Sequence, residues 1–211
     1  MKIIISTSDK YQHLLPIFFY LFNKHWNKPA ELVGYTKPDN LPDNISFYSM
    51  GEDRGPKYWS TDLRKYFESQ EDWFIWIMED TFIKEEVNEN KMNDCFAMNY
   101  NGIGRVDLTK DVQKRQHTVN NGYAWAHPMS RYRLSTQPSI WNKQFLLNYL
   151  HDGMDPWEFE TQDPTDDGWQ IVSAIDYPIV HNEGVRRHDI FKLDLNGIED
   201  PEVLQLCSSF I

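Results

Sequence analysis

The sequence predicts a single α/β domain with a mixed, mostly parallel sheet that is flanked by helices. In the first half of the chain, short apolar runs at residues 3–5, 31–35, 45–49 and 73–78 alternate with segments of helical spacing. This alternation is typical of βαβ units with right-handed crossovers. The chain of 211 residues is long enough for one sizeable core, and its sequence contains no internal repeat and no clean linker.

The helical segments of the first half are residues 10–26 and 58–69, and Pro16 predicts an irregularity near the start of the first. The run Trp73–Met78 is apolar at every position, which predicts a strand buried on both faces of the sheet. The second half is less regular. We expect helices at 87–98 and 142–150, one or two helices within 155–175, and extended segments at 103–108, 122–126, 132–140 and 177–180.

Composition and charge limit the possible partners. The net charge of −11 disfavours binding to a phosphate backbone, so a nucleic-acid partner is not expected. Two cysteines, Cys95 and Cys207, do not form a disulfide framework, which favours a reducing cytoplasm. No apolar run approaches the roughly 20 residues of a membrane span, and the N-terminus lacks the pattern of a signal peptide. We therefore expect a cytoplasmic protein without a membrane span.

Two carboxylates follow the buried run directly. Glu79 and Asp80 stand at the carboxyl end of the predicted strand, where open α/β sheets bind their ligands. Carboxylate oxygens bind hard divalent cations, which also bind phosphate oxygens. The alternative is that Glu79 and Asp80 are simply a solvated strand end.

A second candidate is the segment 177–187, in which His181 follows an apolar stretch and Gly184 permits close approach of a ligand. Arg186, Arg187 and the later Lys192 carry the charge that pyrophosphate requires. The alternative interpretation is a surface turn with solvated arginines.

Two further segments carry polar groups beside aromatic ones. In 155–160, Trp157 precedes Glu158 and Glu160, which point different ways, and we favour Glu160 as a general base. The alternative there is a helix N-terminus, where acidic residues are favoured by the dipole. In 131–141, alternation places Arg133, Ser135 and Gln137 on one face, with Trp141 as a stacking surface for sugars, or else forms an edge strand with a polar outer face.

The order of these motifs resembles small glycosyltransferase-like proteins of the GT-A fold that occur in bacteria, phages and large algal viruses. The resemblance covers roughly residues 2 to 192. Its motifs are the first loop with Tyr11, Trp59-Ser60 with Leu63, Glu79-Asp80, Arg133-x-Ser-x-Gln-Pro, Pro156-Trp-x-Phe-Glu160 and His181-x-Glu-Gly184.

This resemblance implies a nucleotide-binding half at residues 1–100 and an acceptor half at 101–211, a nucleotide-sugar donor, and Mn²⁺ or Mg²⁺ as the cofactor. Asp80, Glu79 and His181 match the metal ligands, and Glu160 matches the acceptor-side base of inverting members. Asp80 and Glu160 are the predicted catalytic residues. The predicted donor-binding residues are Thr7, Ser8, Asp9, Tyr11, Trp59, Glu79, Arg186 and Lys192, and the predicted acceptor-binding residues are Arg133, Gln137, Trp141 and Trp157.

Three hypotheses follow. The leading one is a metal-dependent glycosyltransferase that uses a nucleotide-sugar donor, with a UDP-sugar first, and a hydroxyl acceptor in a glycan or a related molecule. The second is a non-catalytic carbohydrate- or nucleotide-binding module of the same fold. The third is a glycosyltransferase that acts on a DNA base, which requires a segregated basic face formed by Lys110, Lys114, Arg115, Arg131 and Arg133.

Overall fold

The computed structural model describes residues 1–110, 117–120, 122–163, 165–186 and 189–208. The strands of the main sheet are β1 (Lys2–Ser6), β2 (Ala30–Gly34), β3 (Ile45–Ser49), β4 (Trp73–Met78), β6 (Ile103–Asp107), β7 (His117–Asn120), β8 (Tyr123–Ala126), β9 (Ser139–Asn142) and β10 (Gln170–Ala174). Two small sheets pair β5 (Thr81–Ile83) with β11 (His181–Glu183), and β12 (Val185–Arg186) with β13 (Asp189–Leu193).

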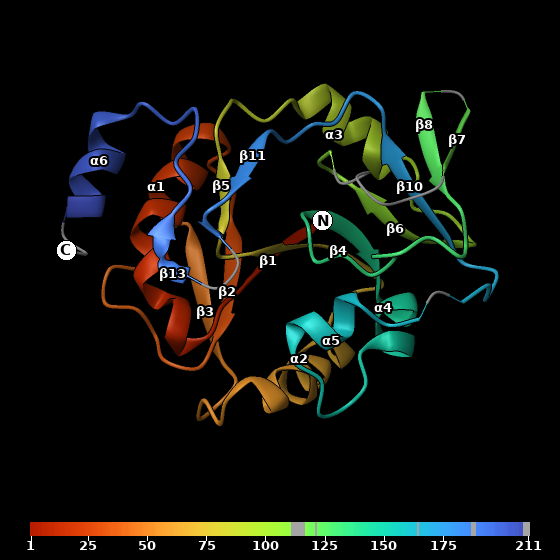
Figure 1. Cartoon of the computed structure of the whole chain (residues 1–211), viewed down its shortest axis with the longest axis horizontal. Helices are drawn as coiled ribbons and strands as arrows, with labels where there is room; N and C mark the ends of the chain where they lie inside the picture. The colour runs from red at the N-terminus through yellow and green to blue at the C-terminus, as the bar shows by residue number, and fades with distance from the viewer. Residues whose placement is uncertain (111–116, 121, 164, 187–188, 209–211) are drawn as a thin grey trace.

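The helices lie on both sides of the main sheet (Figure 1). They are α1 (Leu15–His25), α2 (Trp59–Glu68), α3 (Glu89–Phe96), α4 (Lys143–Tyr149), α5 (Pro156–Glu160) and α6 (Pro201–Ser208). Two 3₁₀ turns, Asp9–Leu14 and Pro56–Tyr58, precede α1 and α2. The first of them ends just before Pro16, which stands in the first turn of α1, so the predicted irregularity is confirmed.

The main sheet has nine described strands in the order β3-β2-β1-β4-β9-β6-β10-β8-β7. The strand β9 is antiparallel to both β4 and β6, and β8 is antiparallel to both β10 and β7. The other seven of these nine strands run in one direction. The predicted mixed, mostly parallel α/β sheet is therefore confirmed.

The strands β1 and β4 bury side chains on both faces of the sheet, as the apolar run Trp73–Met78 predicts for β4. Ile3, Ile5, Ile75 and Ile77 face the cluster around α1. The side chains between them, such as Trp76, face a second cluster that contains residues of α2, α4 and α5. Each large apolar side chain that is fully buried contributes about 1.5–3 kcal/mol, so these alternating positions hold the helices to the sheet.

The chain adds strands first on one side of β1 and then on the other side. From β1 it proceeds through α1 to β2 and then to β3, and it returns through α2 to β4 on the other side of β1. Because α1 and α2 cover opposite faces, the loops that leave β1 and β4 diverge at their carboxyl ends. Such a switch point is where open α/β sheets form a ligand-binding crevice.

Three predictions about the second half of the chain are wrong. Residues 170–174 form the strand β10 instead of part of a helix, because Ile171 and Val172 fill the cores on opposite faces of the sheet. Most of 132–140 is a turn, in which Tyr132 has φ 54° and Pro138 lacks an N–H for the ladder, and the strand β9 begins only at Ser139. Residues 177–180 are also not a strand, and β11 begins directly after them.

Among the helices that the structure describes, none has the length and apolar character that a membrane crossing requires.

One glycine of β6 tests the packing between the sheet and α4. A Cβ at Gly104 would lie 2.4 Å from Cγ of the buried Phe145. Overpacking of this kind costs about 1–3 kcal/mol. We therefore expect Gly104→Ala to lower the free energy of unfolding by this amount, as measured by urea denaturation. In a Phe145→Leu background the added methyl group should cost less, and equal costs in both backgrounds would contradict the proposed contact.

Candidate functional site

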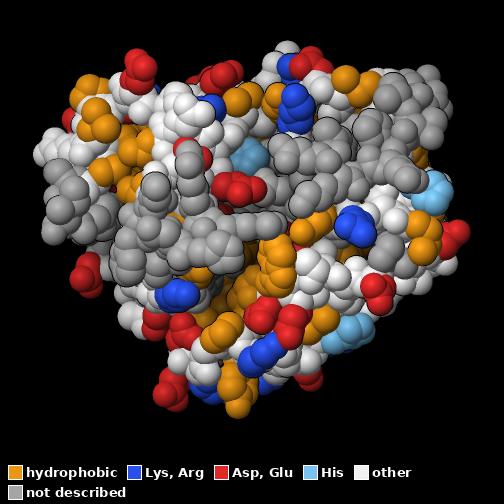
Figure 2. Space-filling model, in the orientation of Figure 1, with side chains coloured by type: hydrophobic (Ala, Val, Ile, Leu, Met, Phe, Trp, Pro, Cys, Tyr) orange, Lys and Arg blue, Asp and Glu red, His pale blue; other side chains and the backbone are white. Residues whose placement is uncertain are grey.

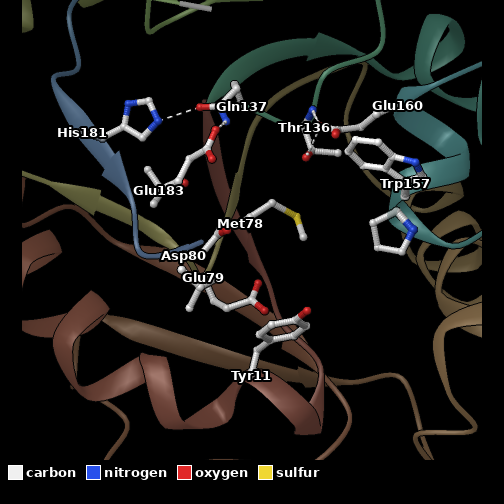
Figure 3. Close-up of a pocket in the computed structure, with 13 residues that line it drawn as sticks. Tyr11, Met78, Glu79, Asp80, Thr136, Gln137, Trp157, Glu160, His181 and Glu183 are labelled. Carbon is white, nitrogen blue, oxygen red and sulfur yellow. Dashed lines mark hydrogen bonds between the residues drawn. The ribbon is translucent and has the colours of Figure 1, made fainter. Parts of the chain in front are cut away.

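A cavity of about 300 Å³ opens at the carboxyl ends of β1 and β4, at the switch point of the sheet (Figure 3). Its walls come from five parts of the chain: the 3₁₀ turn with Tyr11, the segment from the end of β4 to β5, the turn before β9, the helix α5, and the strands β11 and β12. The lining residues are Tyr11, Met78, Glu79, Asp80, Thr81, Thr136, Gln137, Pro156, Trp157, Glu160, His181, Glu183 and Val185.

The loop after β4 contributes two carboxylates. The amide of Glu79 donates to the Ser6 carbonyl at 3.2 Å, which ties this loop to the end of β1. The Glu79 side chain is 3% exposed, and its Oε2 has no hydrogen-bond partner among the described atoms. Burial, and then the charge of Asp80, raise the pKa of Glu79 well above its usual range. Burial, and then the charges of Glu183 and Glu160, raise the pKa of Asp80 to about 7.

The strand β11 pairs with β5 and so brings His181 and Glu183 beside this acidic loop. The Gly184 amide donates to the Asp80 carbonyl at 2.5 Å. The space that a side chain would need at Gly184 is filled by the Phe82 ring, 2.6 Å from the position of a Cβ. Gly184 therefore permits close packing of Phe82, where the sequence predicted close approach of a ligand.

The Gln137 side chain joins two groups of this wall. Its amide nitrogen donates to Oε1 of Glu183 at 3.0 Å, and its amide oxygen lies 2.6 Å from Nε2 of His181. An ionised carboxylate offers only acceptors, so the nitrogen of Gln137 must face Glu183 and the oxygen must face His181. In this arrangement Nε2 of His181 carries the proton and is a donor.

The opposite wall consists of α5 and the turn before β9. Trp157 and Glu160 are three residues apart, so they lie on one face of α5, and both line the cavity. Oε1 of Glu160 accepts from the Thr136 amide at 2.5 Å and from the Thr136 hydroxyl at 2.7 Å. Glu158 instead closes a capping box with Asp155 at the start of the helix. The structure thus places Glu160, and not Glu158, in the cavity.

Met78 and Tyr11 also line the cavity. The Trp76 indole donates to the Ser6 hydroxyl at 2.8 Å, and the Ser6 hydroxyl donates to Sδ of Met78 at 3.1 Å. In Figure 3 the Met78 thioether lies between the acidic loop and the side of Thr136 and Glu160. The Tyr11 ring lies beside Glu79, and burial, followed by the charges of Glu79 and Asp80, raises the pKa of its hydroxyl.

The cavity is acidic and partly aromatic. Its lining includes four carboxylates and one histidine, and no lysine or arginine belongs to it within the described part of the chain. Figure 2 shows acidic and hydrophobic side chains together around a hollow near the middle of this face. Trp157 is 48% exposed at the rim, where its ring is available to a ligand with an apolar face.

Several residues that the sequence predicted for the site lie elsewhere. Trp59 is buried against Trp76, with ring centroids 6.0 Å apart, and Trp141 is fully buried in the same aromatic cluster. Arg133 is 4% exposed, forms an ion pair with Asp167 at 2.6 Å, and donates to the Trp169 carbonyl. None of these three predicted residues lines the cavity.

The first loop is organised by one carboxylate. Asp9 accepts from the amide of Thr36 at 3.0 Å and from its hydroxyl at 2.8 Å, so it ties the loop after β1 to the end of β2. Thr7 is 4% exposed and Ser8 is half-buried, and neither lines the cavity. Only Tyr11 of the predicted first-loop residues does. The backbones of Arg186 and Lys192 belong to β12 and β13, and their side chains lie outside the described part of the structure.

Six lining residues were not predicted as site residues: Met78, Thr81, Thr136, Pro156, Glu183 and Val185. Met78 adjoins the predicted Glu79, and Glu183 belongs to the motif His181-x-Glu-Gly184; these are the signals they carry. Thr136 was placed on the opposite face from Gln137 by assuming a strand. Because the segment is a turn, the side chains of both residues reach the cavity.

The predicted metal ligands do not form a metal centre. Among the described residues, no group of three His, Cys, Asp or Glu side chains is arranged to hold a metal ion. Glu79 and Asp80 have the right donor chemistry, and the unpartnered Oε2 of Glu79 is an available ligand atom. As their side chains stand, Glu79, Asp80 and His181 do not converge on one point among the described residues, so the predicted three-ligand site is not formed.

No protein-family model matches the chain, and no curated protein matches it. Solved structures do resemble it. They include a cytidylyltransferase from Leptospira borgpetersenii serovar Hardjo-bovis, strain JB197, with 12% identity, coverage of 75% of this chain and 67% of that chain, and a TM-score of 0.45. Another is the galactosyltransferase LgtC in complex with donor and acceptor sugar analogs, with 10% identity, coverage of 99% and 96%, and a TM-score of 0.48.

A third is the mannosyltransferase PcManGT from Pyrobaculum calidifontis in complex with GDP-Man and Mn²⁺. It has 10% identity, coverage of 99% of this chain and 73% of that chain, and a TM-score of 0.46. At these identities and TM-scores, the likenesses do not bear on the activity of this chain.

The raised pKa of Asp80 predicts a pH-dependent stability. A carboxyl whose pKa is higher in the folded state than in the unfolded state favours folding when protonated, and this contribution is lost as the pH rises through about 7. In EDTA, we expect Asp80→Asn to melt several degrees above the wild type at about pH 8, and close to it at about pH 4, since each kcal/mol shifts Tm by about 2–4 °C in a chain of this size.

The control for this measurement is Asp163→Asn, which changes an exposed carboxylate outside the cavity. At both pH values, Asp163→Asn should show the same difference in melting temperature from the wild type. If Asp80→Asn follows the wild-type profile at both pH values, the proposed burial of a charge at Asp80 is wrong.

Proposed function

We propose that the protein transfers a sugar from a nucleotide-sugar donor, a UDP-sugar first, to a hydroxyl group of a glycan or a related acceptor. The observation that carries this proposal is the position of Glu160. It is a carboxylate in the crevice at the switch point, beside the exposed Trp157 ring and across the cavity from Asp80. A base next to a stacking surface is what a reaction at a sugar hydroxyl requires.

The proposed chemistry uses one proton transfer. Glu160 takes the proton of the acceptor hydroxyl while the acceptor oxygen forms a bond to the anomeric carbon of the donor sugar. The bond between that carbon and the donor phosphate breaks, and the nucleoside diphosphate leaves with the electron pair. Trp157 packs against the C–H face of a sugar, which orients the reacting hydroxyl toward the carboxylate. This scheme inverts the configuration at the anomeric carbon.

The charge of the cavity bears on the donor. Four carboxylates line it, and a diphosphate is repelled unless positive charge accompanies it. The resemblance implies Mn²⁺ or Mg²⁺, and the described residues do not assemble the predicted three ligands. The scheme is therefore restricted to the protein's own groups, and the assays must compare Mn²⁺, Mg²⁺ and EDTA directly.

Glu160→Gln tests the proposed base. Gln retains the hydrogen-bond acceptor for Thr136 and cannot accept a proton, so transfer should fall about 10²- to 10⁴-fold, the usual contribution of a general base. The measurement is turnover of UDP-, GDP- and CDP-sugars with a panel of hydroxyl acceptors. Donor binding, followed by thermal shift, should change little.

The matched control is Glu158→Gln on the same helix. Glu158 points away from the cavity toward Lys57, and Gln also closes a capping box. This variant should retain wild-type turnover. Equal losses in both variants would indicate damage to α5 in place of a lost base, and unchanged turnover in Glu160→Gln would exclude Glu160 as the base.

The other two hypotheses are outcomes of the same assays. Sugar or nucleotide binding without hydrolysis or transfer supports the non-catalytic binding module. For a DNA-base substrate, Arg133 is buried and paired with Asp167, and Lys114 and Arg115 lie outside the described residues. Salt-dependent retention on DNA remains the test of that basic face.

A further inference from the structure

A buried ion pair lies behind the turn that carries Thr136 and Gln137. Arg105 and Asp107 are both fully buried in β6, and their charged groups are 2.5 Å apart. Nη1 of Arg105 donates to the carbonyls of Arg133 at 3.2 Å and Ser135 at 2.5 Å. A buried charged pair is retained only with well-directed partners of this kind, so the turn is fixed from inside the protein.

The same network reaches one residue further. The Ser139 hydroxyl donates to the Gln137 carbonyl at 2.8 Å and lies 3.3 Å from Oδ1 of Asp107. Alternate carbonyls of the turn, at residues 133, 135 and 137, are thus all bound to groups of one buried cluster. The amide and the side chain of Thr136, which lies between these carbonyls, are turned toward the cavity.

Thr136 directs both of its donors to a single oxygen. Its amide and its hydroxyl each bind Oε1 of Glu160, at 2.5 and 2.7 Å. Within the described part of the chain, no donor is bonded to Oε2. A carboxylate held at one oxygen by two donors has little freedom to rotate, so Oε2 is the oxygen that remains for a ligand.

We propose that Thr136 is a positioning residue for Glu160, one that holds Oε1 and presents Oε2 to the acceptor hydroxyl. This inference rests on the proposed function, in which Oε2 receives the hydroxyl proton as the acceptor oxygen bonds to the anomeric carbon and the diphosphate leaves. The role of Thr136 is distinct from that of a structural residue because the hydroxyl acts on the ionised form of Glu160.

Several charged groups surround Glu160. Across the cavity are Asp80, Glu183 and His181, and the carboxylates of α5 itself, Glu158 and Asp155, are turned toward Lys57. The carboxylate form of Glu160 accepts the hydrogen bond from the Thr136 hydroxyl. Thr136→Val removes this bond and leaves the side chain of Glu160 freer to rotate.

The test compares Thr136→Val with Thr136→Ser. Valine keeps the shape and the backbone amide and removes only the hydroxyl. We expect kcat to fall about 10- to 100-fold, the loss that follows when a charged group loses a hydroxyl donor, with donor KM within about twofold. The acidic limb of the kcat/KM profile should move to higher pH. Thr136→Ser should restore both quantities.

Thr165→Val, at an exposed position outside the cavity, is the control for the change from threonine to valine. Melting temperatures of all variants exclude a loss of fold. If Thr136→Val keeps the wild-type kcat and pH profile, or if serine is no better than valine, the inference is overturned.

A second measurement separates this inference from the proposed function. The ionisation of the Glu160 side chain is followed by carbon-13 NMR, with the resonance assigned through Glu160→Gln. In Thr136→Val its midpoint should move to higher pH, and Thr136→Ser should reverse the change, whether or not any donor is turned over. If the wild type shows no transfer activity, only the proposed function is wrong. If the titration midpoint of Glu160 is the same in Thr136→Val as in the wild type, the positioning role is wrong.

Discussion

The parallel pairing of β1 with β4 is the contact on which the rest of the structure depends. Its register aligns Ser6 with Met78, so both strands end at the same level and their following loops form one crevice. The Ser6 hydroxyl and carbonyl then bind Met78 and the amide of Glu79. A shift of one residue would exchange the two faces of β4 and place each of its apolar side chains against the wrong core.

This geometry concentrates like charges in a place where they are costly. Glu79 and Asp80 are held together at a buried strand end, and Glu160 and Glu183 approach from the other walls. Burial disfavours the ionised form of each buried carboxyl, and no lysine or arginine among the described lining residues offsets it. The folding free energy comes from the apolar clusters on the two faces of the sheet. Such local conflict with stability is typical of functional sites.

Much of this fold follows from the periodicity of the sequence. The apolar run before Glu79 predicts both the buried strand and the acidic loop, and the helical spacing of α5 separates Glu160 from Glu158. Residue type alone does not distinguish a ligand-binding side chain from a buried one. Trp59 and Trp141 fill the core, and Arg133 is paired with Asp167, because long-range packing decides the environment of each.

The position of the turn between residues 133 and 137 depends on long-range contacts, which the local sequence does not reveal. A strand at this place would be fixed by the ladder of the sheet, and a free loop would not hold Thr136 to within the tolerance that a proton transfer requires. The Arg105–Asp107 pair supplies donors to the carbonyls of this turn and so replaces the missing ladder. An apolar core could be equally stable, but it offers no directed bonds to a backbone. We infer that this polar cluster specifies the position of the turn, and with it the orientation of Glu160.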